Sequence, residues 1–172
     1  MKEKSSVHEA KYQNGSMSLK EYTIIGKVLL KNISPDELEK ISKRKLRKNS
    51  IWNKVLKNFE GISPFLGLAL ITLIDRPISY FNNFEAFKHF MGIVPSIEKN
   101  DFSQYRKILC FMIADNLIEN NDEWKGKFKE IIEQYSNREP DWKEDKIEAY
   151  SRKKLAQWFL QFYYNKLNEL NL

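Results

Sequence analysis

Most of the chain after residue 33 places its apolar residues at the spacing of an α-helix. One predicted helix face consists of four residues at positions i, i+3, i+4 and i+7: Trp52, Val55, Leu56 and Phe59. The same spacing recurs along the second half of the chain, whereas no alternating run is long enough to predict a strand. The pattern therefore predicts an all-α fold, a helical bundle.

Helix-capping residues divide this pattern into separate elements. Ser34-Pro35-Asp36-Glu37 is a capping box with proline at the first helical position, so we expect a helix to begin there. Further start signals lie at four places: Asn82 to Glu85, Asp101, Asn121 or Asp122, and Pro140-Asp141. Gly92 is well placed to end the helix that starts at the first of these. The last signal predicts a long C-terminal helix.

Composition suggests three parts of the chain. Residues 1–17 are polar and without periodicity, and we expect a disordered, flexible tail. Residues 18–50 are predicted to be a basic helical N-terminal segment, although residues 18–30 are also compatible with a strand. Residues 51–172 are predicted to form the main helical domain.

The segment Gly61-Ile62-Ser63-Pro64 predicts a tight turn between two helices. Pro64 suits the first position of a helix, and Gly61 suits a backbone conformation that a Cβ would disfavour. Helix, short glycine turn and helix is the pattern of a helix-hairpin-helix element. Such a turn presents backbone N–H groups at a helix N-terminus, where the helix dipole favours a phosphate. An ordinary hairpin of two helices, with glycine as the C-cap, remains the alternative.

Positive charge is concentrated immediately before this turn. The chain has a formal net charge of +6, and a single segment, Leu38 to Lys57, carries eight cations against Glu39. Lys40, Lys43, Arg44 and Arg47 share one helix face at spacings of 3, 4 and 7. Like charges at this spacing destabilise an isolated helix slightly, which a bound polyanion would offset.

A basic helix that leads into a turn suited to phosphate predicts a nucleic-acid-binding surface. The candidate contact residues are Lys40, Lys43, Arg44, Arg47, Lys48, Lys57, Gly61, Ile62 and Ser63. Gly61, Ile62 and Ser63 would contact phosphates through their backbone, and the six lysines and arginines would attract phosphates through their charge. The alternative is a solvated helix face with no ligand.

Other chemistry is sparse in this sequence. Cys110 is the only cysteine, and His8 and His89 are the only histidines, so we expect no metal site, no disulfide framework and no cofactor. The longest apolar run, Ile62 to Ile74, is interrupted and too short to cross a bilayer. No signal-peptide pattern opens the chain, and we expect a cytoplasmic protein without a membrane partner.

Several motifs follow one another in a fixed order between Trp52 and Tyr164. They are Gly61-Ile62-Ser63-Pro64, Leu70, Asp75, Phe84, His89 to Pro95, Tyr105 to Leu109, Trp124 to Tyr135, and Ala149 to Leu155. In this order and at this spacing they resemble the C-terminal domain of the DEDD-type, bridge-RNA-guided insertion-sequence transposases. The resemblance implies a helical domain from a mobile element that binds nucleic acid.

The catalytic parts of that family have no counterpart here. The family's nucleophilic serine lies in a Ser- and Gly-rich loop, whereas Ser96 to Asp101 is short and acidic, and neither Ser96 nor Ser103 matches the motif. The family's Mg²⁺-binding carboxylates lie in a preceding ribonuclease-H-like domain, and the residues before Gly61 are too few and too basic to form one. Ser63 also stands where the family usually has a second glycine. We therefore expect no enzymatic activity.

These observations together favour a non-catalytic protein that binds DNA or structured RNA mainly through phosphates. A first alternative is a protein-interaction or regulatory module, mobile-element or viral, whose basic helix faces an acidic protein surface. A second alternative is a recombinase fragment that acts with a separate catalytic chain.

Overall fold

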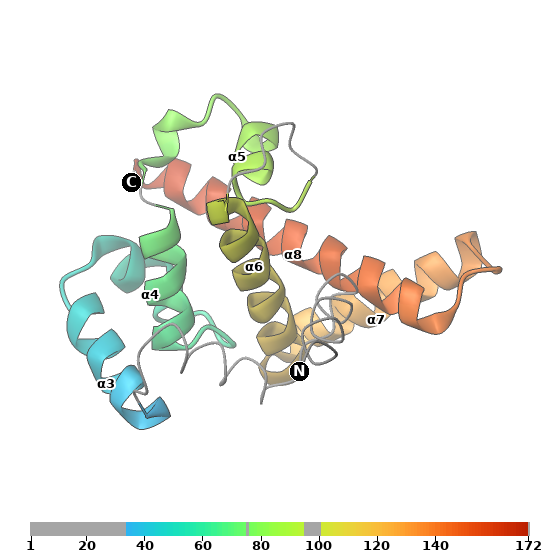
Figure 1. Ribbon diagram of the computed structural model, residues 1–172, viewed down its shortest axis with the longest axis horizontal. Helices are drawn as coiled ribbons and strands as arrows, with labels where there is room; N and C mark the ends of the chain where they lie inside the picture. The colour runs from blue at the N-terminus through green and yellow to red at the C-terminus, as the bar shows by residue number, and fades with distance from the viewer. Residues whose placement is uncertain (1–33, 75, 95–100, 172) are drawn as a thin grey trace, which may run out of the picture.

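The computed structural model describes residues 34–74, 76–94 and 101–171 of the chain (Figure 1). The described elements are α3 (Pro35–Leu46), the π-helix η1 (Trp52–Leu56), α4 (Pro64–Leu73), the 3₁₀ helix η2 (Ile78–Tyr80), α5 (Phe84–Phe90), α6 (Asp101–Asn120), α7 (Asp122–Arg138) and α8 (Glu144–Glu169). No strand occurs among these residues, and the predicted all-α fold is confirmed. The predictions for residues 1–33 and for the loop after Val94 lie outside the described ranges.

Helix α8 is the central element of the fold. It packs against α5, α6, α7 and both short helices, while α4 lies between α3 and α6 (Figure 1). Its buried residues follow one another at helical spacing: Leu155, Phe159, Leu160, Tyr163 and Leu167. Phe159 and Tyr163 of α8 thus lie in the core, whereas Tyr150 near the start of the same helix is exposed.

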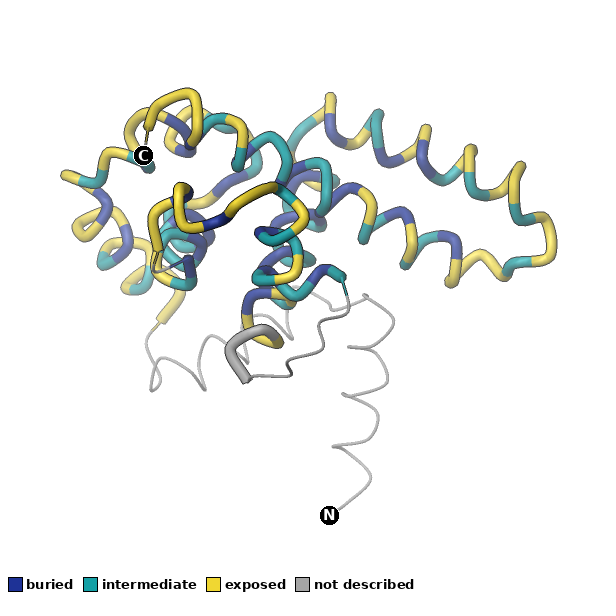
Figure 2. Tube along the Cα trace, turned by 90° about the horizontal axis from the view of Figure 1, so that it is seen from above, coloured by how far each residue is buried: buried dark blue, intermediate teal, exposed yellow. Residues whose placement is uncertain are grey.

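Helices α7 and α8 run antiparallel and extend from the bundle as an arm (Figure 2). The rings of Tyr135, Trp142 and Tyr150 meet at the end of this arm, with the first two stacked at 6.1 Å and the last two 4.7 Å apart. Nearer the bundle, Arg152 of α8 forms ion pairs of 2.9 Å with Asp115 of α6 and with Glu148. These contacts fix the arm to α6 at its base and hold its two helices together at the tip.

Side-chain caps set most of the helix starts at the predicted positions. Ser34 Oγ accepts from the N–H of Glu37 at 3.2 Å, Asn83 Oδ1 from Ala86 at 2.9 Å, and Asn121 Oδ1 from Trp124 at 3.2 Å. Helix α6 begins at Asp101, as predicted. Gly92 has a φ of 71°, which fits its expected place after a helix end.

The predicted start of the last helix is wrong. Pro140 and Asp141 lie in a turn in which the N–H of Trp142 donates to the carbonyl of Glu139 at 3.0 Å, and α8 begins only at Glu144. Its N-cap, Lys143, supplies no side-chain hydrogen bond. The ring of Trp142 stacks on Tyr135 and lies tilted against Tyr150, and these contacts, which the local sequence does not reveal, hold the turn.

The element before the glycine turn differs from the regular helix that the spacing predicts. Trp52, Val55 and Leu56 are buried, as expected, but residues 52–56 form a π-helix in which the N–H of Lys57 donates to the carbonyl of Trp52 at 2.8 Å. The helical stretch ends at Leu56, so Phe59 lies beyond it. Phe59 still joins the core, because its ring contacts Trp124, Phe159 and Phe162.

Candidate nucleic-acid interface

The glycine turn lies against the C-terminal end of α6. Gly61 has a φ of 90°, a backbone conformation that residues other than glycine rarely adopt. A Cβ at this position would lie 3.0 Å from Leu117 Cδ2 and 3.3 Å from Leu117 Cα. Both backbone conformation and space therefore require glycine here, which agrees with the role that the sequence predicts for this residue.

Two asparagines hold the carbonyl groups of the turn. Asn116 Nδ2 donates to the carbonyl oxygen of Gly61, and Asn121 Nδ2 donates to that of Glu60 at 2.9 Å. Asn121 also caps α7, so one side chain fixes both the start of that helix and the position of the turn. The sequence marks Asn121 as a helix start, but no local pattern links either asparagine to the turn, because they lie 55 and 61 positions beyond their partners.

The N-terminus of α4 follows the turn directly. Ser63 is the N-cap, and its Oγ accepts from the N–H of Leu66 at 3.2 Å. Pro64 has no N–H to offer. Among the hydrogen bonds of the described residues, none has the N–H of Ser63 or Phe65 as donor. These two groups are the donors that an anion at this helix end would meet.

The expected phosphate contact from Ile62 is not supported by the structure. Its N–H donates to the carbonyl of Phe59 at 3.1 Å, and its side chain is buried. Ile62 instead anchors the turn to the core. The predicted set does not include Phe65, whose N–H is the first backbone donor of α4 because Pro64 has none.

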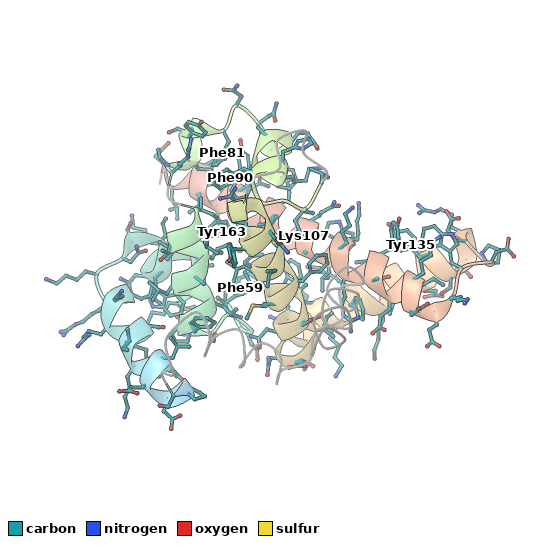
Figure 3. The ribbon with its side chains drawn as sticks, in the orientation of Figure 1. Phe59, Phe81, Phe90, Lys107, Tyr135 and Tyr163 are labelled. Atoms are coloured by element: carbon teal, nitrogen blue, oxygen red, sulfur yellow. The ribbon has the colours of Figure 1, made fainter. Side chains whose placement is uncertain are left out.

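All six predicted cationic contact residues are exposed: Lys40, Lys43, Arg44, Arg47, Lys48 and Lys57. On α3, Ser42 and Leu46 are buried, so the opposite face carries the charge. Figure 3 shows side chains of α3 and of the segment after it projecting away from α4. Lys45 and Lys54 are exposed as well and enlarge this surface beyond the predicted set.

Only one of these cations has a carboxylate partner among the described residues. Lys43 Nζ lies 2.7 Å from Glu39 Oε1, and both side chains are more than half exposed. An exposed pair of this kind contributes little to stability and is screened by salt. Within the described ranges, no ion pair links the other cations of this surface to a carboxylate.

The two halves of the predicted site lie on different sides of α4. Helix α3 packs against α4, whereas the turn packs against α6, and Figure 1 shows α3 and α6 flanking α4. No hydrogen bond or ion pair within the described ranges joins the turn to α3. A ligand that contacts both must therefore extend across the N-terminal end of α4.

No group of three His, Cys, Asp or Glu side chains that could hold a metal occurs among the residues described. Within the same ranges, no helix combines the length and the apolar character that a membrane crossing requires. Cys110 is buried in the core, and burial raises the pKa of its thiol despite the nearby Arg106. Cys110 is therefore part of the packed core.

Comparison of the chain with protein-family models, with curated proteins and with solved structures gave no match.

Proposed function

We propose that this protein binds DNA or structured RNA without catalysing a reaction, and that it derives from the C-terminal domain of a transposase. The single observation that carries the proposal is the exposed cationic surface of α3 and the residues after it. Contacts to phosphates supply much of the affinity of a protein for nucleic acid, and lysines and arginines are the usual residues that make them.

The distribution of charge supports this proposal. The segment from Leu38 to Lys57 has a net charge of +7 while the whole chain has +6, so the remainder is close to neutral. A chain that needed positive charge only for solubility would spread it over the surface. Concentration of charge on α3 and the residues that follow it is instead the electrostatic footprint of a polyanion-binding protein.

The turn adds a second and more specific contact in this proposal. The N–H groups of Ser63 and Phe65 would bind one phosphate oxygen at the start of α4, where the helix dipole also favours negative charge. Lys57 lies between α3 and the turn along the chain and would extend the charged surface toward it.

Salt dependence of binding tests the proposal directly. Duplex DNA and an RNA hairpin are titrated with the protein over a range of salt concentrations. If five or six phosphates are neutralised, the slope of log K against log salt is about −5 on duplex DNA. The triple variant Lys40→Gln, Arg44→Gln, Lys48→Gln is expected to reduce the slope by about 3.

A matched control separates this surface from total charge. The triple variant Lys125→Gln, Lys129→Gln, Lys154→Gln removes the same charge from exposed positions on the arm. It is expected to leave slope and affinity nearly unchanged. A flat salt response of the original protein, or an equal effect of the two triple variants, would contradict the proposal and favour a protein partner for the basic helix.

A further inference from the structure

The short helix η2 holds an unusually exposed aromatic ring. Tyr80 is 58% exposed, whereas its neighbours Ile78 and Phe81 are buried at 4% and 6%. The ring of Tyr80 contacts the ring of Phe81 edge to face, at 5.4 Å and 86°. Buried neighbours therefore fix the backbone and one edge of this ring while leaving most of the residue in solvent.

A cation lies against the ring of Tyr80. The guanidinium carbon of Arg76 is 4.4 Å from the ring centroid, which is the geometry of a cation–π contact. The guanidinium covers part of one ring face, and the exposure of Tyr80 leaves area for a second flat group. A flat ring with a positive charge beside it is the combination that stacks on a nucleobase and attracts its phosphate.

The surroundings of Tyr80 repeat this pairing of cations with rings. Arg106 lies 3.8 Å above the ring of Phe90 and donates from Nε to the Phe90 carbonyl at 2.5 Å. The ring centroids of Phe90 and Phe81 are 4.9 Å apart, and both residues are labelled in Figure 3. Lys107 is exposed on the next position of α6. Glu85 of α5 is paired with Lys88 at 2.6 Å.

We infer that Tyr80 is a stacking platform for an unpaired nucleobase, with Arg76 beside it. This inference rests on the proposed function and extends it from phosphate contact to a class of nucleic acid: a duplex with an adjoining single strand. Stacking of this kind tolerates any base, because every base has a π-face. It would therefore add affinity without sequence preference.

The length of α4 sets the distance between the two proposed contacts, the phosphate at the glycine turn and the nucleobase on Tyr80. The glycine turn lies at the start of α4, and the chain reaches η2 shortly after its end (Figure 1). A helix of 10 residues is about 15 Å long. At about 3.4 Å per nucleotide this distance corresponds to about four nucleotides. An overhang of about six nucleotides is therefore long enough to reach Tyr80 from a duplex bound at the turn.

The test compares a blunt DNA duplex with the same duplex carrying a thymidine overhang of about six nucleotides. The overhang contains one 2-aminopurine, whose fluorescence falls when it stacks on an aromatic ring. We expect the original protein to bind the overhang substrate about tenfold more tightly than the blunt one and to quench the fluorophore. Tyr80→Ala is expected to lose both effects, and Tyr80→Phe to keep them.

Tyr150→Ala is the matched control, because Tyr150 is also a well-exposed tyrosine at 44% but lies on the arm, where residues 138–146 carry four carboxylates against three cations. It is expected to bind and quench like the original protein. Equal affinity for both substrates without quenching would overturn the inference and leave the proposed function intact. Absence of binding to either substrate at low salt would overturn both. Thermal unfolding of each variant checks whether it retains the fold of the original protein.

Discussion

Asn116 donates a hydrogen bond from its amide nitrogen to the carbonyl oxygen of Gly61, 55 residues earlier in the chain. With Asn121 on the carbonyl of Glu60, it directs the carbonyl oxygens of the turn toward the end of α6. Carbonyl oxygens repel phosphate, so their engagement on the side of α6 leaves the N–H groups at the start of α4 as the polar groups that a ligand meets.

Replacement of Asn116 by alanine is expected to destabilise the protein by about 1 kcal/mol, because a partly buried carbonyl loses its donor. Affinity for nucleic acid should fall as well, since the turn is no longer held in place. Urea unfolding and a binding titration measure the two effects. Asn168→Ala is the control, because Asn168 Nδ2 donates to the carbonyl of Tyr164 at 2.9 Å on its own helix, α8, and does not contact the turn. A loss of the same size in both variants would contradict the role given to Asn116.

Substitutions of Gly61 and Ser63 should differ in their effects on stability and binding. Gly61→Val is expected to damage both folding and binding, because valine disfavours a positive φ and its side chain would meet Leu117. Ser63→Gly should cost only a few tenths of a kcal/mol, since glycine is an acceptable N-cap. Circular dichroism and binding measurements report both. Unchanged stability and binding of Gly61→Val would show that the turn is assigned wrongly.

Gly67→Ala is expected to destabilise the protein by about 1–3 kcal/mol. A Cβ there would lie 2.5 Å from the Trp52 ring, on which α4 packs closely. Gly126→Ala provides the opposite case, because no atom lies within 4 Å of its Cβ position in the middle of α7. That variant should be more stable by up to about 1 kcal/mol. Thermal unfolding that moves both variants in the same direction would contradict the close packing of α4 on Trp52.

Tyr163→Phe is expected to leave stability at neutral pH unchanged or to raise it by about 1 kcal/mol. The Tyr163 hydroxyl is buried, and among the described residues it has no hydrogen-bond partner. Burial raises the pKa of Tyr163 above its ordinary value of 10.0. The unfolded chain therefore loses this proton first, and stability should fall as the pH rises above about 10.

The phenylalanine variant should lose less stability than the original protein between about pH 9 and pH 11. Urea unfolding of both proteins across this range isolates Tyr163, because every other titrating group is shared. Parallel curves for the two proteins would mean that this hydroxyl ionises equally in the folded and unfolded states.

Incubation with Mg²⁺ or Mn²⁺ and DNA is expected to yield no cleaved or covalently linked product. Serine-mediated strand transfer needs an activated hydroxyl and a stabilised leaving group, and neither Ser96 nor Ser103 lies in a recognisable motif. Denaturing electrophoresis of labelled substrates is the measurement. A phosphoserine adduct that disappears in Ser96→Ala or Ser103→Ala would instead support the recombinase alternative.

Local signals in the sequence were sufficient for the all-α fold and for most helix starts. Each of the caps Ser34, Asn83 and Asn121 accepts a hydrogen bond from the backbone N–H three residues later. Such local caps can be recognised without knowledge of the fold. The exposure of the basic residues followed from the same periodicity, because Ser42 and Leu46 point inward on α3.

Features that depend on distant partners could not be predicted in this way. The link between Asn116 and Gly61, the use of the Ile62 N–H by Phe59, and the delay of α8 to Glu144 all arise from packing. The π-helix before the turn is a further example. It buries Trp52 against α4, which is possible only because Gly67 lacks a Cβ.

The arm formed by α7 and α8 has a consequence for hydrogen exchange. Among the described elements, each of these helices has only the other as a neighbour toward the tip, whereas near α6 they share a wider core (Figure 2). Local opening costs least free energy where few apolar contacts break, so amide protons should exchange fastest at the tip and more slowly toward Arg152. The stacked rings of Tyr135 and Trp142 are expected to slow this fraying, and Trp142→Ala should extend rapid exchange several turns along both helices.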